Sequence, residues 1–256
     1  MRVAVLSSGG KDSTYATWWA IMQGWDVECL VTVHVTGDDS MMFQMTNTAI
    51  VSLHASSIGI SWLPILSSGQ ENKEIDDLKK ALIGESNPLN DFQVIKSQIT
   101  TINYPKKIDI HCGPLDIDAL VVGALRSDYQ KTRIERMCEE LGIISYCPLW
   151  HNPSEEHMNS LLSNGFDVRI VSTSTDGMEK EWLGQKLNHK SLQKLITLSK
   201  KYRFNLDGEG GEFETIVVAA PHFSSDIDIS GEAEWNKIRG VWNITSASLK
   251  STNNTK

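Results

Sequence analysis

The sequence lacks the features that mark several large classes of protein. Among its 256 residues there are only four cysteines, none of them in a Cys-x-x-Cys pair or at a spacing typical of metal sites. No apolar run approaches the length of a membrane span, and no signal peptide precedes the first apolar segment. The pattern therefore argues against a disulfide scaffold, a zinc module or a membrane protein. We expect a cytoplasmic protein with reduced thiols and no membrane partner.

The sequence also contains fewer basic than acidic residues. The chain has 24 Lys and Arg against 32 Asp and Glu, which gives a formal net charge of −8. Proteins that bind nucleic acids or anionic membranes are usually basic, so we expect no direct nucleic-acid partner. The hydrophobic share of 40% is ordinary for a globular protein, and the length allows one large or two modest domains. Nothing in the sequence indicates an oligomeric state.

The N-terminal segment has the pattern of a strand, a glycine turn and a helix. An apolar run at residues 3–6 leads into Ser-Ser-Gly-Gly-Lys-Asp-Ser at residues 7–13, and a helical pattern follows. We expect the N–H groups of Gly9, Gly10 and the first helical turn to be unpaired and to attract an anion. The glycines let the backbone approach a phosphate, and Lys11 adds positive charge. The spacing differs from that of a Walker P-loop, and a glycine turn that only reverses the chain is the alternative.

Apolar runs and amphipathic segments alternate through the first 147 residues. Strand patterns occur at 28–35, 62–66, 119–122 and 143–147, and helical patterns at 46–58, 71–83 and 128–141. This alternation predicts an α/β fold with a doubly wound, Rossmann-like parallel sheet that is covered by helices on both faces. Ligands of such sheets bind at the carboxyl ends of the strands, where residues 7–13 would also lie.

The pattern changes after residue 147. We predict an N-terminal nucleotide-binding domain at residues 1–147 and a smaller C-terminal α+β domain at residues 148–235 that binds the substrate. Residues 236–256 have the composition of a polar, frayed tail. Residues 86–118 hold three prolines and show no clean period, so we assign no structure to them.

A second unusual stretch, Gly-Glu-Gly-Gly-Glu-Phe-Glu-Thr, occupies residues 208–215. Its carboxylates, Glu209, Glu212 and Glu214, lie within six residues and beside three glycines. Like charges so close together repel, so the cluster suits a cation, whether Mg²⁺, a cationic substrate or an amine awaiting deprotonation. A solvated acidic turn before a strand explains the same residues, and chemistry alone leaves both interpretations open.

The two motifs together resemble the diphthine–ammonia ligase family, in its archaeal-type single-enzyme form, within the PP-loop superfamily of ATP pyrophosphatases. Residues 8–13 match the PP-loop, and residues 208–215 match the family's second motif. Residues 122–130 with the following Arg133, residues 148–150, and residues 181–184 extend the likeness, which runs in order from Arg2 to about Phe223. The resemblance implies a Rossmann-like PP-loop (HUP) domain at the N-terminus. The chain departs from the family at Gln44, Thr46, Gln185 and Asn188.

The resemblance also implies an activity. The family converts diphthine, a histidine of elongation factor 2 with a trimethylammonio-carboxypropyl arm, into diphthamide. The diphthine carboxylate would attack the α-phosphate of ATP and release pyrophosphate, and ammonia would then displace AMP from the acyl-adenylate. This implies ATP and Mg²⁺ as cofactors, and diphthine-bearing elongation factor 2 and ammonium as partners. No glutaminase domain is present in the sequence, so we expect free ammonium as the nitrogen donor.

The matched motifs imply a set of site residues. Catalytic roles would fall to Lys11, Asp12, Arg133 and Glu212, with Asp12 as the metal ligand. The nucleotide would contact Ser7, Ser8, Gly9, Gly10, Lys11, Asp12, Ser13, His34, Gly123 and Ser127. The substrate would contact Asn47, Tyr129, Gln130, Trp182, Glu209, Gly210, Gly211 and Glu214.

Other functions remain compatible with the sequence. One is a PP-loop enzyme that modifies tRNA, although such enzymes commonly carry catalytic cysteines or RNA-binding modules. A second is a member of the same family that acts on a different small carboxylate, which the departures at Gln44, Thr46 and Gln185 keep open. A third is a nucleotide-binding sensor without chemistry, which would have no need of the acidic motif at residues 208–215.

Overall fold

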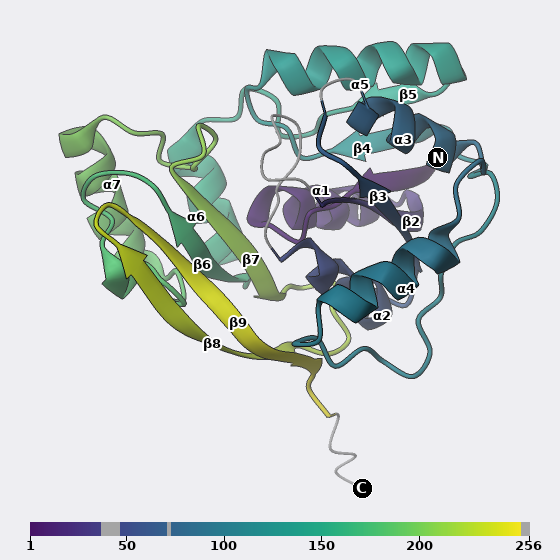
Figure 1. Ribbon diagram of the computed structural model, residues 1–256. Coiled ribbons are helices and arrows are strands. Elements are labelled where there is room, and N and C mark those ends of the chain that lie inside the picture. Colours follow the sequence, from purple (N-terminus) through teal and green to yellow (C-terminus); the bar gives the residue numbers. More distant parts are fainter. Residues whose placement is uncertain (37–46, 71–72, 252–256) are drawn as a thin grey trace, which may run out of the picture.

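The first part of the chain forms a five-stranded parallel sheet. Figure 1 shows the computed structural model, which describes residues 1–36, 47–70 and 73–251. The strand order is β3-β2-β1-β4-β5, and each neighbouring pair is parallel. The strands are β1 (Arg2–Leu6), β2 (Asp26–Val35), β3 (Ser61–Ser67), β4 (Ala119–Val122) and β5 (Ile144–Tyr146).

Helices cover both faces of this sheet, because its central strands are apolar on both sides. In β1, Val3 and Val5 face one helical layer, whereas Ala4 and Leu6 face the other. The first layer holds α1 (Lys11–Met22), η1 (Thr48–Ile50), α2 (Val51–Ile58) and α4 (Pro88–Gln98), and the second holds α3 (Lys73–Leu82) and α5 (Asp128–Leu141). The predicted doubly wound α/β fold is confirmed.

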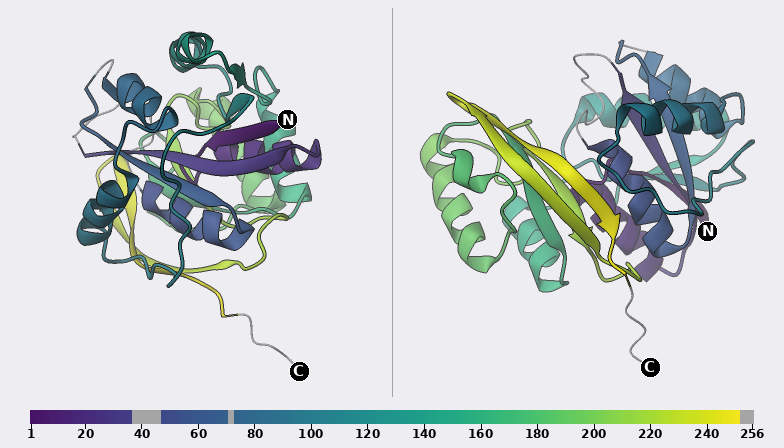
Figure 2. Two further views of the ribbon diagram at one scale, coloured as in Figure 1. Left: turned by 90° about the vertical axis from the view of Figure 1, so that its right-hand side faces the viewer. Right: turned by 60° about the horizontal axis from the view of Figure 1, so that its bottom comes forward.

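The second part of the chain forms a smaller antiparallel sheet with the order β7-β6-β9-β8. Its elements are α6 (Ser154–Ser163), β6 (Asp167–Thr173), η2 (Lys180–Trp182), α7 (His189–Tyr202), β7 (Phe213–Ala219), β8 (Ile227–Asn236) and β9 (Arg239–Leu249). One face of this sheet packs on α6 and α7, and the other shares a buried core with α1 and α2. In Figure 2 the antiparallel sheet accordingly lies between its own helices and the parallel-sheet half.

The polar tail predicted for residues 236–256 is wrong over most of its length. Strands β8 and β9 pair as a long hairpin, in which Trp242 and Ala247 are buried. Ala247 also donates to the carbonyl of Thr101 at 2.9 Å and accepts from the N–H of Asn103 at 2.8 Å. The hairpin therefore ties the end of the described chain to its first half. Residues 252–256 of the predicted tail lie outside the described residues.

Residues 86–118, to which the sequence assigned no structure, contain α4. The side chain of Asn87 caps this helix by accepting the N–H of Asn90 at 3.2 Å, and Pro88 occupies its first turn. Among the described residues no helix combines the length and apolar character that crossing a membrane requires. The domain boundary at residues 147 and 148 stays a prediction.

Candidate active site

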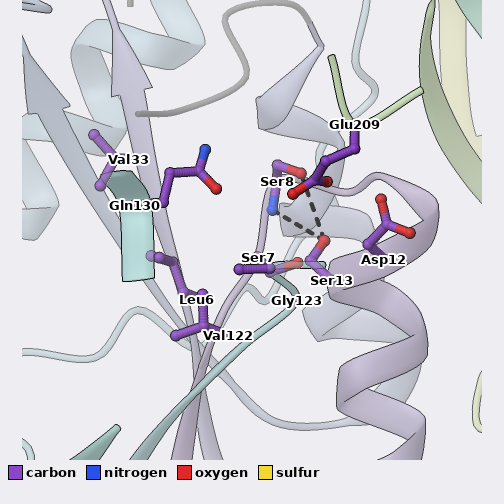
Figure 3. Close-up of a pocket in the computed structure, with 11 residues that line it drawn as sticks. Leu6, Ser7, Ser8, Asp12, Ser13, Val33, Val122, Gly123, Gln130 and Glu209 are labelled. Carbon is purple, nitrogen blue, oxygen red and sulfur yellow. Dashed lines mark hydrogen bonds between the residues drawn. The ribbon is translucent and has the colours of Figure 1, made fainter. Parts of the chain in front are cut away.

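A pocket opens at the carboxyl ends of β1, β2 and β4. Because α1 and α5 follow β1 and β4 on opposite faces of the sheet, this is where such folds bind ligands. The lining residues, drawn in Figure 3, are Leu6, Ser7, Ser8, Asp12, Ser13, Val33, Val122, Gly123, Ala124, Gln130 and Glu209. Those that the sequence predicted are Ser7, Ser8, Asp12, Ser13, Gly123, Gln130 and Glu209. The pocket thus joins the glycine turn to the acidic motif.

The glycine turn is shaped by close packing on both sides. Gly9 has φ of +82°, and a Cβ there would lie 2.3 Å from Cγ2 of Ile50. Only glycine fits this combination of conformation and space. On its other side the carbonyl of Gly9 accepts the N–H of Val217, in β7, at 3.0 Å. The second sheet therefore helps to set the path of a loop near the N-terminus.

The N–H groups of the turn are not all unpaired, and this part of the expectation is wrong. Lys11 donates its N–H to Oγ1 of Thr215 at 3.1 Å. Ser8 donates to Oγ of Ser13 at 3.3 Å, and Gly10 to Oγ of Ser8 at 3.4 Å. The last two bonds are long and involve hydroxyls that rotate, so they yield readily to a phosphate oxygen.

One hydroxyl of the pocket has no hydrogen bond within the described part of the chain. Ser7 Oγ is buried and without a partner there, at the end of β1. A buried hydroxyl without a partner costs free energy, so it favours a ligand that supplies one.

Lys11, Asp12 and His157 form a chain of contacts at the start of α1. Lys11 Nζ lies 2.8 Å from Asp12 Oδ2, and His157 Nε2 donates to Asp12 Oδ1 at 2.7 Å. Burial raises the pKa of Asp12, but Lys11 and His157 outweigh burial and leave that pKa below its usual value. Asp12 is therefore a fixed anion at neutral pH. His157 lies on α6, and the sequence analysis did not find it.

Glu209 reaches the pocket from the loop before β7. Its Oε1 accepts the N–H groups of Leu125, Arg126 and Ser127 at 3.3, 3.0 and 3.1 Å. These groups lie immediately before α5, where the helix dipole favours a negative charge. Burial raises the pKa of Glu209, and the nearby charge of Asp12 acts in the same direction.

A buried ion pair fastens the same loop to α5. Asp207, which is fully buried, pairs with the guanidinium of Arg126. Arg126 also donates to Oγ of Ser154 at 3.0 Å and to the carbonyl of Asn152 at 3.2 Å. Burial raises the pKa of Asp207, but its bond with Arg126 outweighs that effect and leaves the pKa lowered.

Position 123 requires glycine because the backbone there lies very close to the backbone of α1, and not because of its φ angle. A Cβ on Gly123 would lie 2.7 Å from the nitrogen of Ser13 and 2.8 Å from the carbonyl carbon of Asp12. The loop after β4 thus rests directly on the first turn of α1, and the two walls of the pocket touch here.

The structure does not bring every predicted residue to the pocket. Glu212 accepts the N–H and side-chain amide of Asn205 at 2.8 and 2.9 Å, and the N–H of Gly210 at 2.8 Å. These bonds close the glycine-rich turn and do not line the cavity. Trp182 is fully buried in the core under α7, with the ammonium of Lys194 5.1 Å from its ring.

Other predicted residues lie at the margins or elsewhere. Arg133 stacks 3.5 Å from the ring centre of Tyr129 and borders a different cavity, between α3 and α5. His34 is hydrogen-bonded to Thr48 at 2.8 Å, and burial lowers its pKa. Ser127 caps α5 rather than lining the pocket. The predicted residues Asn47, Gly210, Gly211 and Glu214 are likewise not among the lining residues. Gln44 and Thr46 lie outside the described residues.

Family models match both halves of the chain. A model of the diphthamide synthase N-terminal domain matches residues 1–112 and 91–145, and a model of the C-terminal domain matches residues 153–249. The chain belongs to the diphthamide synthase family. This result confirms the resemblance that the sequence motifs indicated.

The diphthamide synthase relatives of this chain include proteins named diphthine–ammonia ligase. The fission yeast protein (Schizosaccharomyces pombe) is 30% identical over 231 residues, which cover 89% of this chain and 36% of that protein. The human protein is 28% identical, covering 89% and 82%, and the Danio rerio protein is 28% identical, covering 90% and 86%. The chain therefore spans about a third of the fission yeast relative and most of the vertebrate ones.

A solved structure described as a predicted subunit of a tRNA methyltransferase from Methanocaldococcus jannaschii also aligns with this chain. Its TM-score is 0.41 at 15% identity, with 86% of this chain and 98% of that chain covered. This likeness is too slight to bear on function.

The pocket fits a nucleoside triphosphate. The partnerless hydroxyl of Ser7 and the start of α1 both suit phosphate oxygens. Within the described residues, no three His, Cys, Asp or Glu side chains converge as a metal site. Mg²⁺ on a nucleotide needs only one or two carboxylates besides the phosphates, so Asp12 is sufficient as its protein ligand.

Proposed function

We propose that this protein is an ATP-dependent diphthine–ammonia ligase of the cytoplasm. It would amidate the carboxylate of diphthine on elongation factor 2 through an acyl-adenylate, with release of pyrophosphate and AMP. The observation that supports this most is the meeting of the two family motifs at one pocket. Lys11 and Thr215, 204 residues apart in sequence, are joined by a hydrogen bond, and Glu209 faces the glycine turn.

The phosphate end of the pocket supports activation of a carboxylate. A carboxylate is a poor electrophile, and its attack on phosphorus requires stabilisation of the charge on the departing pyrophosphate. Ser8 and Ser13 offer hydroxyls, the start of α1 offers its dipole, and the buried ammonium of Lys11 offers a full positive charge. When bound, Mg²⁺ would neutralise further phosphate charge, and Asp12 is the residue that would hold it.

The other end of the pocket supports binding of a nucleoside. Leu6, Val33 and Val122 form an apolar wall at the ends of three adjacent strands. Figure 3 shows Leu6 and Val122 side by side, with Asp12 on the far side of the cavity. An apolar wall opposite a polar one matches adenosine joined to its phosphates.

The experiment that tests the proposal measures pyrophosphate release from ATP with ammonium, with and without diphthine-bearing elongation factor 2. Release that depends on this factor, with a mass change from carboxylate to amide, is the expected result. Release without the factor would favour another carboxylate or a different PP-loop reaction. ATP binding without release under either condition would favour a sensor.

Replacement of Lys11 tests the phosphate end. Lys11→Ala should lower the rate of pyrophosphate release by about 100-fold or more, because the departing charge loses its nearest ammonium. Far-UV circular dichroism should show an unchanged fold. Lys200→Ala, which removes an exposed lysine of α7, is the matched control and should leave release unchanged. Full activity of Lys11→Ala would contradict the PP-loop assignment.

A further inference from the structure

The structure separates the three glutamates of the acidic motif. Glu212 uses both carboxylate oxygens to hold Asn205 and Gly210. Glu214 lies in β7 and is not among the residues that line the pocket. Glu209 alone of the three lines it, and Figure 3 shows its carboxylate directed toward Ser8 of the phosphate loop.

Glu209 is held by one oxygen only. Oε1 accepts three backbone N–H groups at the start of α5, from Leu125, Arg126 and Ser127. Within the described residues, Oε2 has no hydrogen bond and Glu209 makes no ion pair. The side chain is therefore fixed in position while its second oxygen stays available to a ligand.

A fixed carboxylate beside a phosphate-binding loop favours a cation between the two, since like charges repel. A quaternary ammonium group has no N–H to donate and is recognised by aromatic rings, and none of the residues found to line the pocket is aromatic. The Mg²⁺ ion expected on the nucleotide is assigned to Asp12 and the phosphates, so it does not account for the free oxygen of Glu209. Ammonium carries four N–H donors, and one carboxylate oxygen binds it by a charge-assisted hydrogen bond.

We propose that Glu209 is the catalytic residue that binds ammonium and accepts its proton in the amidation step, an inference that rests on the proposed ligase function. One N–H bond of ammonium breaks, and the proton moves to Oε2. The nitrogen lone pair then forms the C–N bond to the acyl carbon. The bond from that carbon to the AMP oxygen breaks, its electron pair leaves with AMP, and a second proton passes from nitrogen to solvent.

The test compares two nucleophiles with Glu209→Gln, using elongation factor 2 that carries diphthine. Hydroxylamine is largely neutral at pH 7 and attacks without losing a proton first, whereas ammonia is largely protonated. We expect amide formation from ammonium to fall about 100-fold or more, the typical worth of a general base. Hydroxamate formation from hydroxylamine, and its pyrophosphate release, should stay at the wild-type rate.

The glutamine variant is conservative, because its amide oxygen can still accept the three N–H groups. Glu139→Gln, which removes the same charge from an exposed site near the other end of α5, is the control and should alter neither reaction. If Glu209→Gln fails to fold, Glu209→Asp is the second variant. It keeps the negative charge but places the carboxylate farther from the pocket, because its side chain is shorter. The same selective loss of amide formation is expected.

Three results would overturn the inference. Equal loss of amide and hydroxamate, or a raised Mg²⁺ requirement for pyrophosphate release, would make Glu209 a structural or metal residue. Unchanged amide formation in Glu209→Gln would show that Glu209 takes no part in the reaction. A wild-type protein that forms neither product would instead overturn the ligase function itself, so the two failures are distinguishable.

Discussion

At the scale of single residues, Gly123 shows how little room separates the two walls of the pocket. Its missing side chain allows the loop after β4 to rest on Asp12 and Ser13, at contacts of 2.7 to 2.8 Å for an added Cβ. Gly123→Ala should force that loop away from α1, with a loss in unfolding free energy of about 1–3 kcal/mol. ATP affinity should fall at least tenfold, a shift that isothermal titration calorimetry measures.

A second glycine, Gly165, serves as the control that separates a clash at the pocket from the backbone strain that any such substitution causes. Gly165 has φ of +82° and no atom within 4 Å of an added Cβ, so Gly165→Ala meets conformational strain but no clash. It should cost about 1 kcal/mol of stability and leave ATP affinity unchanged. Equal ATP affinity in both alanine variants would contradict the close-approach argument.

A short sequence motif is sufficient to predict the site residues that act together with their immediate neighbours in the chain. Ser8, Gly9 and Lys11 belong to one short motif, so their shared position could be predicted without the fold. The role of His157 could not be predicted, because its contact with Asp12 spans 145 residues. The residues that flank His157 in the sequence form no motif that would distinguish it from an ordinary core residue. The separation of Glu209 from Glu212 depends on which backbone N–H groups each meets, and that also requires the structure.

At the scale of elements, α6 acts on α1 through a single side chain. His157 is buried, and its hydrogen bond to Asp12 fixes the carboxylate beside Lys11. His157→Ala should lower kcat for pyrophosphate release about 10- to 100-fold, as loss of an orienting partner commonly does.

His157→Gln is the rescue variant, because its side-chain amide can donate to Asp12 in place of Nε2. Steady-state kinetics with varied ATP and Mg²⁺ should show partial recovery in His157→Gln and none in His157→Ala. Identical kinetics in the two variants would mean that the imidazole only fills space.

The β8–β9 hairpin offers a test of its contribution to stability. The ring of Trp242 is buried and lies against the backbone at Gly184 and Gly231. Trp242→Ala should lower the free energy of unfolding by about 3–5 kcal/mol, measured by urea denaturation. Its exposed neighbour is the control, and Val241→Ala should change stability by less than about 0.5 kcal/mol. Similar losses in both would mean that the hairpin is held by its backbone alone.

The elements that the sequence missed lack the usual signals. The β8–β9 hairpin turns at Lys237 and Ile238, with Lys237 at φ of +57° in place of the glycine or asparagine that marks such turns. A register shift at Ser230 and Gly231 also interrupts its alternation. By contrast, β4 and α5 could be predicted to the residue, because β4 is an unbroken apolar run, α5 has a clear helical period, and a glycine follows each.

At the scale of the whole molecule, the buried His54 and the partly buried His222 lie where the two halves meet. Nε2 of His54, in α2, donates to the carbonyl of Val217, in β7, at 2.8 Å, and burial lowers the pKa of His54 to about 4. Burial, helped by His54, lowers the pKa of His222 to about 3. Neither residue gains a proton in the folded state until the pH is well below that needed in the unfolded chain.

Stability should therefore fall as the pH drops below about 6.5, because the unfolded state then binds more protons. For His54 alone the loss between pH 7 and pH 5 is about 2 kcal/mol. Urea denaturation at a series of pH values measures it. His54→Gln keeps a donor for Val217 but does not titrate, so its stability should depend less on pH. An equally steep dependence in this variant would assign the acid sensitivity to other groups.

The hydrogen bonds from β7 to the glycine turn have a consequence for synthesis. Lys11 is synthesised 204 residues before its partner Thr215, and Gly9 likewise precedes its partner Val217. A nascent chain can complete its parallel sheet and still hold an unfinished nucleotide pocket. The glycine turn therefore gains these two contacts only after β7 has been synthesised.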